Sequence, residues 1–395
     1  MRRVYLDNTA TTPLHPEVLE AMLPYLRDIY GNPQSIHIWG DAPREAIEEA
    51  RAKLADLIGS QPEEIIFTGS GTESNNLAIK GLAQAYQARG KHIVISAIEH
   101  FSVMHSAKTL EKRGFDVTSV PVDGYGLVKL DELAKSIRED TIVVSIMHAN
   151  GEVGTIQNIK EIGKLLKGRG MVFHTDAVAS AGTIPVDVRD MGVDALSLAA
   201  NQFYGPKGAG ALWVRKGVRI IPLLDGGVQE GGRRAGTENV PAIVGMGKAA
   251  ELAQQDMPYR TEHISGLRQR LTQGMVSRID HVLPTGHPDN RLPGNASFCI
   301  EFIEGEAMLM LLSSRGIAAS SGSACTSRAL KASHVLTAMR IPPEIAQSSL
   351  LFTLMRDNTE EDIEYVLETV PSIVDRLRQM SPLYAKFLKK QSGGR

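Results

Sequence analysis

The sequence predicts an α/β fold: a large domain with a mostly parallel sheet covered by helices on both faces, and a smaller α+β domain. Between residues 92 and 177, short continuous apolar runs alternate with helical segments, as in parallel strands buried on both faces. The chain has 395 residues, is 43% hydrophobic and 22% charged, and is long enough for two domains. We expect the large domain over residues 16–255, and the small domain over residues 1–15 together with 256–395.

The N-terminal part begins with a polar turn. Residues 8–13, NTATTP, precede a helix expected from about residue 16 to 25, and the turn can serve simply as its N-cap. Apolar residues in helical spacing over 42–58 predict an amphipathic helix.

A short buried strand expected over 65–68 leads into the glycine-rich segment 68–81, TGSGTESNNLAIKG. Small residues come before a helix that should begin near Thr72. Helix N-terminal amides can hold a phosphate, and a glycine-rich entry to a helix can equally have no ligand. The absence of a following Gly-Lys-Ser/Thr excludes a P-loop.

Polar residues follow the strands of the alternating region. The expected strands are 92–100, 117–123, 141–149 and 171–177, and the helices between and beside them are 103–112, 129–137 and 159–166. His100, Asn150 and Asp176 lie at or just after strand ends. Each has an ordinary explanation as a loop residue, a turn or a helix cap. Three polar residues in these positions indicate one crevice, because the carboxyl ends of parallel strands meet at the same edge of the sheet.

The second half continues with helices expected at 241–256, 259–278 and 360–376, strands at 296–304 and 348–359, and a disordered tail over 389–395. Cys299 lies in the first of these strands and should be packed in a sheet. Cys325 lies in SSGSACTS, a Ser/Gly-rich stretch that predicts a mobile polar loop with an accessible thiol. A surface cysteine without a role is the alternative.

Composition excludes several classes of function. The net charge of −2 and pI near 6.6 give no electrostatic case for nucleic acid or an anionic membrane. Two cysteines without CxxC spacing argue against a zinc site of their own and against a disulfide framework. No run is long enough for a signal peptide or a membrane span, and we expect a cytoplasmic protein.

The stretch around which the chain is organised is 197–208, SLAANQFYGPKG, where an apolar strand ends in the polar pair Asn201-Gln202. This turn resembles that of the cysteine desulfurases, pyridoxal-phosphate (PLP) enzymes of fold type I. YLDNTATTP, ESNNLAIKG, EHFSVM, HANGEVGT, HTDA, YGPKG and SGSACTS follow in that family's order. The resemblance covers nearly the whole chain.

The resemblance implies a homodimer and a set of site residues. Cys325 would be the catalytic thiol that accepts sulfur. His100 would stack on the pyridine ring and act in catalysis, Asp176 would pair with the ring nitrogen, and Asn150 would lie near the phenolic edge. The remaining residues expected to contact the cofactor are Gly71 and Thr72 at the phosphate, Thr237 at the phosphate of the neighbouring subunit, and Gln202.

The departures from the family gather on one side of the cofactor. The family has a His-Lys pair at Asn201-Gln202, and its lysine forms the Schiff base. A carboxamide nitrogen is not a usable nucleophile, so Gln202 cannot do this. Three further family residues, a glutamine, a phosphate-binding serine and a carboxylate-binding arginine, are replaced by Ala179, Ala199 and Leu351. Arg356 should lie on the other side of the last strand or beyond it.

Three functions follow from this pattern. The first is a desulfurase-like protein of iron–sulfur assembly that keeps Cys325 as a sulfur carrier or as a thiolate ligand to a cluster shared with a scaffold protein. The second is an active desulfurase that binds PLP non-covalently and acts on L-cysteine. The third is a PLP lyase or transferase with another substrate. Retention of SGSACTS favours the first two, and loss of the lysine and arginine favours the first.

Overall fold

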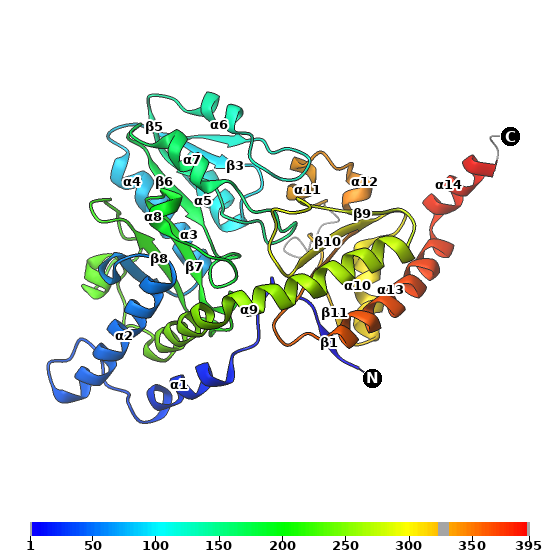
Figure 1. Ribbon diagram of the computed structural model, residues 1–395. Helices are drawn as coiled ribbons and strands as arrows, with labels where there is room; N and C mark the ends of the chain where they lie inside the picture. Colours follow the sequence, from blue (N-terminus) through cyan, green and yellow to red (C-terminus); the bar gives the residue numbers. More distant parts are fainter. Residues whose placement is uncertain (1, 323–331, 393–395) are drawn as a thin grey trace.

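Seven strands form the central sheet, in the order β2-β8-β7-β6-β5-β3-β4 (Figure 1). The computed structural model describes residues 2–322 and 332–392. The strands are β2 (Ile65–Thr68), β3 (His92–Ser96), β4 (Asp116–Val120), β5 (Thr141–Ser145), β6 (Val172–Asp176), β7 (Ala195–Ala199) and β8 (Gly210–Val214). Only β8 in this sheet pairs antiparallel with both of its neighbours, and β3 to β7 are parallel. The predicted mostly parallel sheet is confirmed.

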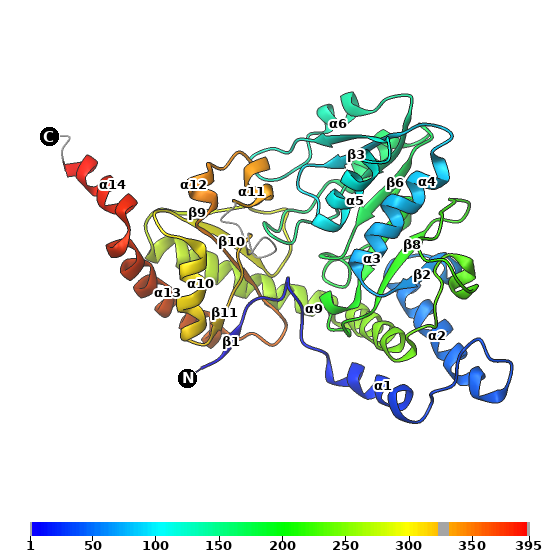
Figure 2. The same ribbon diagram turned by 180° about the vertical axis from the view of Figure 1, so that it is seen from behind.

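Helices cover both faces of this sheet (Figures 1 and 2). One core joins the sheet to α2, α7 and α9, and another joins it to η2, α4 and α5. The bounds are α1 (Pro16–Arg27), α2 (Ile38–Leu57), η1 (Pro62–Glu64), α3 (Gly71–Asn76), the π-helical η2 (Leu77–Gly81), α4 (Leu82–Tyr86), α5 (Phe101–Glu111), α6 (Leu130–Ser136), α7 (Ile159–Leu166), α8 (Val188–Met191), η3 (Ala200–Gln202) and η4 (Gln229–Gly232). Strand residues alternate between the two cores, because successive side chains point to opposite faces.

A second, antiparallel sheet has the order β12-β10-β9. Its core includes side chains of α9, α10 and α13. The bounds here are β9 (Val282–Pro284), β10 (Asn295–Ile300), α10 (Gly305–Ser314), β11 (Ile317–Ala318), α11 (His334–Ala338), α12 (Pro343–Ala346), β12 (Ser349–Thr353) and α13 (Glu360–Met380). β1 (Val4–Tyr5) pairs with β11. The N-terminal strand therefore lies with the C-terminal part of the chain.

The two helices expected at 241–256 and 259–278 are one helix, α9 (Val240–Arg278). The expectation of two helices was wrong, because α9 continues through Pro258. Proline removes one backbone donor from a helix interior, but α9 packs against α1, α2 and α13, and this packing compensates. Because α9 runs alongside both sheets (Figure 1), the division of the chain near residue 255 stays a prediction.

The C-terminal tail is also more ordered than expected. Residues 389–392 end α14 (Pro382–Ser392), and 393–395 lie outside the described residues. Tyr384 and Phe387 pack against Phe302, with ring centroids 5.5 and 4.7 Å apart, and anchor this helix. No helix in the described part of the chain combines the length and apolar character that a membrane crossing requires.

Candidate functional site

A cavity of about 410 Å³ lies where the carboxyl ends of the parallel strands meet. The residues predicted to contact a cofactor that line it are Gly71, Thr72, His100, Asn150, Asp176 and Gln202. The positions that depart from the desulfurase pattern line it too: Ala179, Ala199, Asn201 and Leu351. No lysine or arginine is found among its described lining residues. The structure thus brings together positions that the sequence spreads over 280 residues, from Gly71 to Leu351.

Asp176 ends β6 and is 4% exposed. Its Oδ2 accepts a hydrogen bond from Asn75 Nδ2 at 2.6 Å, and its Oδ1 accepts one from the Val178 amide at 2.9 Å. Burial raises the pKa of this carboxyl, and the charge of His100 opposes the rise. A buried carboxylate of this kind would gain from a cationic partner in the cavity. Asn75, which positions it, was missed, although it stands in the ESNN motif.

His100 is the N-cap of α5 and lines the cavity. Its Nδ1 accepts from the Ser102 amide at 3.2 Å and lies 2.7 Å from the Ser102 hydroxyl. The same hydroxyl oxygen accepts from Asn75 at 2.9 Å. His100 and Asp176 are therefore held by one connected set of hydrogen bonds.

Gly71 begins α3 directly after the N-cap Ser70, whose hydroxyl accepts from the Glu73 amide at 3.1 Å. A Cβ at Gly71 would lie 2.7 Å from Val178 Cγ2 and 3.2 Å from Ala199 Cβ. A side chain at position 71 would have to displace Val178, so glycine suits this close approach between the helix start and the strand ends. The first-turn amides of a helix lack partners within it, as phosphate binding requires.

Asn150 forms a turn, which is the ordinary explanation that the sequence offered for this residue. Its Oδ1 accepts from the Glu152 and Val153 amides at 2.9 and 3.0 Å, and its Nδ2 donates to the Ile98 carbonyl at 3.0 Å. The side chain is 3% exposed and shapes the cavity wall. Its contact with the ring of a cofactor stays a prediction.

Asn201 and Gln202 lie in η3, which follows β7. Gln202 Nε2 donates to the Thr9 carbonyl at 2.9 Å. The Asn201 carbonyl accepts from the Thr12 amide at 2.9 Å and from the Thr12 hydroxyl at 3.1 Å. The turn that carries the polar pair is thus fastened to the N-terminal segment 9–12.

Leu351 is buried in β12, opposite Ser297 of β10. Arg356 lies beyond the end of β12, as expected, and its guanidinium is 3.7 Å from Asp256 and 3.2 Å from Asp357. It does not line the cavity. At position 351 the wall of the cavity is therefore apolar.

Two carboxyls in the cavity wall were not predicted. Burial raises the pKa of Glu99 to about 8 and that of Glu152 to about 7. Glu99 Oε1 accepts from the Ser96 hydroxyl at 2.6 Å and the Met147 amide at 2.8 Å. Glu152 is partly exposed as a residue, although its Oε1 is buried without a hydrogen bond. The only feature of the sequence that could have indicated Glu99 as a site residue is its position directly before His100.

The remaining residues singled out in the sequence lie away from this cavity or outside the described part of the chain. Thr237 is exposed, between η4 and α9, and does not line this cavity. Cys299 is fully buried in β10, as expected, and burial raises the pKa of its thiol to about 12. Cys325, predicted as catalytic thiol and metal ligand, lies outside the described residues. Within those residues no group of three His, Cys, Asp or Glu could hold a metal.

Comparison with known proteins places this geometry in a family. The family described as "Aminotransferase class-V" matches residues 4–366. The chain belongs to the class-V aminotransferase family. A curated relative, cysteine desulfurase IscS of Methanosarcina thermophila, is 53% identical over 385 residues, which cover 98% of this chain and 95% of the relative. Cysteine desulfurase IscS 1 of Archaeoglobus fulgidus is 49% identical, over 97% of this chain and all of the relative.

Solved structures agree with this class-V assignment. A structure titled "NIFS-LIKE PROTEIN" matches with a TM-score of 0.90 and 39% identity, over 95% of this chain and 100% of that one. A NifS-like protein from Rickettsia africae matches with a TM-score of 0.86 and 33% identity, over 95% of this chain and 100% of that one. The α/β fold is therefore fold type I of the PLP enzymes, and PLP is the cofactor of this family.

Proposed function

We propose that the chain is a cysteine desulfurase-like protein of iron–sulfur cluster assembly or sulfur transfer whose ordinary PLP-dependent desulfuration is impaired or lost. Cys325 would act as the sulfur carrier or as a thiolate ligand to a cluster. The observation that carries the proposal is the side chain at the family's lysine position: Gln202, hydrogen-bonded to Thr9 in the wall of a cavity whose described residues include no lysine. The named relatives are cysteine desulfurases.

The pyridine end of the cavity fits PLP. Asp176 is buried with its carboxyl ready for a protonated ring nitrogen, His100 is fixed on the cavity wall, and Gly71 lets the start of α3 lie close to Val178 and Ala199. These residues, with Thr72 and Asn150, would hold the cofactor without a covalent bond. PLP supplies an electron sink when it is bound. What the protein does is to stabilise the ring's charge with Asp176 and to orient its face with His100.

The opposite end of the cavity is poorly suited to desulfuration. An amide at position 202 offers no nucleophile. Leu351 offers no donor for a substrate carboxylate, a task in which arginine binds through two parallel hydrogen bonds. Ala179 and Ala199 offer no hydrogen-bonding side chain to the cofactor. A carboxylate ligand would meet Glu99 and Glu152 without a described lysine or arginine.

Two other functions have weaker support. An active desulfurase with non-covalent PLP and L-cysteine as substrate would use the same Asp176 and His100. A PLP lyase or transferase with another substrate would suit the apolar wall at Leu351, but would leave the SGSACTS segment without a role. Under the favoured function, the partners are a second copy of the chain and an iron–sulfur scaffold protein.

The test uses the purified full chain. We expect no sulfide release from L-cysteine with added PLP at a rate near 1 per second, on the order of ordinary turnover numbers. We also expect that borohydride reduction followed by mass spectrometry finds no pyridoxyl group on the chain. Sulfide at that rate would favour the active desulfurase, and a pyridoxyl-lysine, for example at Lys207, would reveal a substitute nucleophile.

A further inference from the structure

A groove of about 990 Å³ lies at the edge of the large sheet opposite the cavity that contains Asp176. It is lined by Val172, the first residue of β6, and by Trp213 near the end of β8. β8 runs antiparallel to β7, so its end lies beside the start of β7. Val172 and Asp176 stand at the two ends of β6, about 13 Å apart at about 3.3 Å per residue. The groove is therefore separate from the cavity at the carboxyl ends of the strands.

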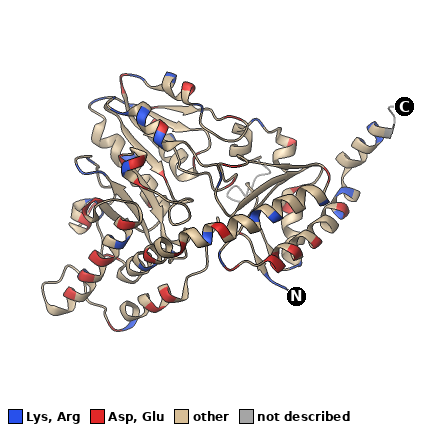
Figure 3. Cartoon of the chain, viewed as in Figure 1, with Lys and Arg blue, Asp and Glu red and all other residues tan. Residues whose placement is uncertain are grey.

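The groove is basic, although the chain as a whole is not. Seven of its lining side chains are Lys or Arg and three are Asp or Glu, whereas the whole chain has 43 and 45 of these residues. The cations come from four places in the sequence: the turn after α4, α7 with the residue that follows it, α8, and the loop after β8. Figure 3 shows Lys and Arg at α7, at α8 and in that loop. A concave surface with an excess of one charge attracts ions of the opposite charge.

The spacing of residues on α7 directs three lysines to the groove. Lys160, Lys164 and Lys167 are four and three residues apart, so they lie on one face of the helix. Lys160 forms an ion pair with Asp190 of α8 at 2.5 Å, and Lys164 forms one with Glu161 at 2.7 Å. Lys167 is the C-cap of α7, and no acidic side chain of the described residues lies within 4 Å of its ammonium. Its charge is therefore not neutralised by the protein.

The other two acidic side chains of the groove already have partners. Asp194 Oδ1 pairs with Arg215 at 2.6 Å. Glu64 Oε2 accepts a hydrogen bond from the Trp213 indole at 3.0 Å, and its Oε1 accepts one from the Lys216 amide at 2.8 Å. These contacts use the carboxylate oxygens, so the remaining cations of the groove gain little from them.

Four cations line the groove without an acidic partner within 4 Å in the part of the chain that the structure describes: Arg89, Lys167, Arg189 and Lys216. The Arg89 guanidinium lies 5.7 Å from the centre of the Tyr86 ring, a contact that does not neutralise its charge. All four side chains are exposed, and one exposed cation needs no partner other than water. Four cations from four separate segments repel one another across a groove, and a bound anion would remove that repulsion.

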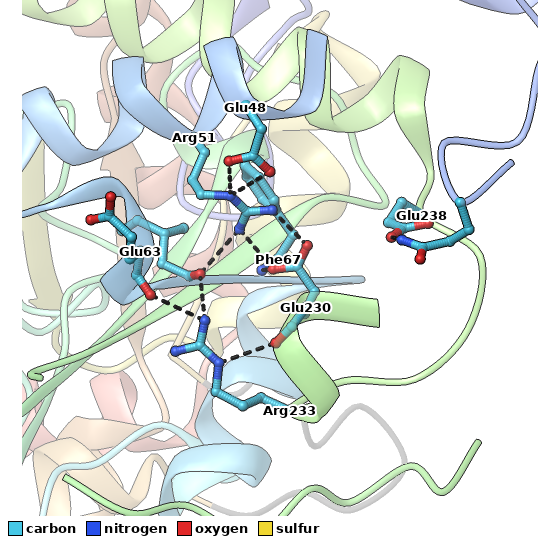
Figure 4. A network of polar contacts seen from close by, with 9 residues as sticks. Glu48, Arg51, Glu63, Phe67, Glu230, Arg233 and Glu238 are labelled. Atoms are coloured by element: carbon cyan, nitrogen blue, oxygen red, sulfur yellow. Dashed lines mark hydrogen bonds and ion pairs between the residues drawn. The ribbon is translucent and has the colours of Figure 1, made fainter. Parts of the chain in front are cut away.

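One wall of the groove, η1, is held in place from its other side (Figure 4). Arg233 donates a hydrogen bond to the Glu63 carbonyl at 3.1 Å. Arg51 donates to the Ile65 carbonyl at 3.1 Å, and it binds both carboxylate oxygens of Glu230 at 2.8 and 2.9 Å. These bonds lie on both sides of position 64. A wall fixed in this way needs little rearrangement when a ligand binds, which favours affinity.

We propose that this groove binds a small molecule that carries several phosphates, such as an inorganic oligophosphate or a nucleoside triphosphate. Four cations around one groove require a compact ligand with several negative charges. The planar guanidinium groups of Arg89 and Arg189 suit phosphate, because each can donate two parallel hydrogen bonds to its oxygens. The volume of the groove is within the range of about 300 to 1,000 Å³ that small-molecule sites occupy. The site includes neither Cys325 nor the cavity residues, so it does not rest on the proposed function.

The experiment is isothermal titration calorimetry of the full chain at low and at near-physiological salt. The probes are sodium tripolyphosphate, ATP and a poly-glutamate peptide. The variants Arg189→Gln, Lys216→Gln and their double combination each remove charge and keep a polar side chain. The matched control is Lys112→Gln, an exposed cation between α5 and β4, the strand at the far end of the sheet. Circular dichroism of each variant reports whether it is folded.

We expect tripolyphosphate and ATP to bind the wild type, and higher salt to weaken both. Each single variant should bind about tenfold more weakly, and the double variant about a hundredfold, because the two side chains come from different elements. Lys112→Gln should bind as the wild type does. Equal affinity for the two probes would support recognition of the phosphates alone, and tighter binding of ATP would support a nucleotide.

Three results would overturn the inference. The first is that neither tripolyphosphate nor ATP binds the wild type at low salt. The second is that only the poly-glutamate peptide binds, because the groove would then serve an acidic protein. The third is that the folded double variant binds tripolyphosphate as tightly as the wild type, because the phosphates would then bind elsewhere, for example at the start of α3.

Discussion

Gln202 Nε2 donates a hydrogen bond to the backbone carbonyl of Thr9 at 2.9 Å. The Thr9 amide in turn donates to the Thr353 hydroxyl at 2.9 Å. The Thr9 hydroxyl donates to the Gly151 carbonyl at 3.3 Å. The side chain at the family's lysine position therefore links the turn after β7, through the N-terminal segment, to β12. The Gln202 amide nitrogen therefore has a structural role in the protein.

The first prediction concerns this link. Gln202→Ala should lower the free energy of unfolding by about 1 kcal/mol, because one partly buried hydrogen bond is lost. The measurement is urea denaturation followed by fluorescence. The control is Asn76→Ala. The Asn76 side chain donates to the Thr72 carbonyl and accepts from Lys80, both within four residues, so its loss should matter less. An equal loss in both variants would show that Gln202 does not join the two parts.

The second prediction restores the family's pair. Asn201→His with Gln202→Lys should attach PLP covalently and produce its visible absorption band, because Asp176 and His100 still line the cavity to receive the ring. Full desulfurase activity should additionally require Leu351→Arg. The readouts are the spectrum and sulfide release from L-cysteine. Full activity of the double variant alone would mean that the carboxylate is bound elsewhere, for example by Arg356.

The third prediction separates the two thiols. Cys299 is fully buried, and its pKa is raised to about 12, so it should react with iodoacetamide only after unfolding. Cys325 should react in the folded protein. Mass spectrometry of peptides from native and denatured samples measures both. A native sample labelled at Cys299 would contradict the packing of β10.

The role of Cys325 is tested in the same protein with its scaffold. Cys325→Ser should leave folding and dimerisation unchanged, and should abolish sulfur transfer or alter the cluster. Anaerobic co-purification with a co-expressed scaffold protein, followed by iron and sulfide analysis, compares it with the wild type. Identical content and cluster spectra would make the chain a structural subunit of the complex.

The fourth prediction is a pH dependence. Burial raises the pKa of Glu99 from 4.5 in its ordinary state to about 8. Between these two pKa values, Glu99 has lost its proton in the unfolded chain but keeps it in the folded protein. The free energy of unfolding therefore falls as pH rises. Glu99→Gln should flatten this slope between about pH 5 and about pH 8, while the exposed Glu344→Gln should not. Parallel slopes for Glu99→Gln and the wild type would show that Glu99 is ionised in the folded protein.

The sequence alone determined the class of fold and the order of its strands along the chain. Apolar runs of strand length alternate with helices between residues 92 and 177, and hydrophobic periodicity is a local property. It also indicated that His100, Asn150 and Asp176 share one crevice, because the ends of parallel strands meet. The structure ends β3 at Ser96 and β5 at Ser145, so that His100 and Asn150 lie in the loops after these strands and only Asp176 ends its strand. The sequence also showed that Gln202 cannot form a Schiff base, since a carboxamide lacks a nucleophilic lone pair in any fold.

Only the tertiary structure decided what surrounds these residues. α9 continues through Pro258 because packing outweighs a missing donor, and the aromatic contacts of Tyr384 hold a tail that composition had marked as disordered. The bonds from Asn75 to Asp176 and from Gln202 to Thr9 join residues 101 and 193 positions apart. Such contacts depend on three-dimensional proximity and on exclusion of water, and neither leaves a local pattern in the sequence.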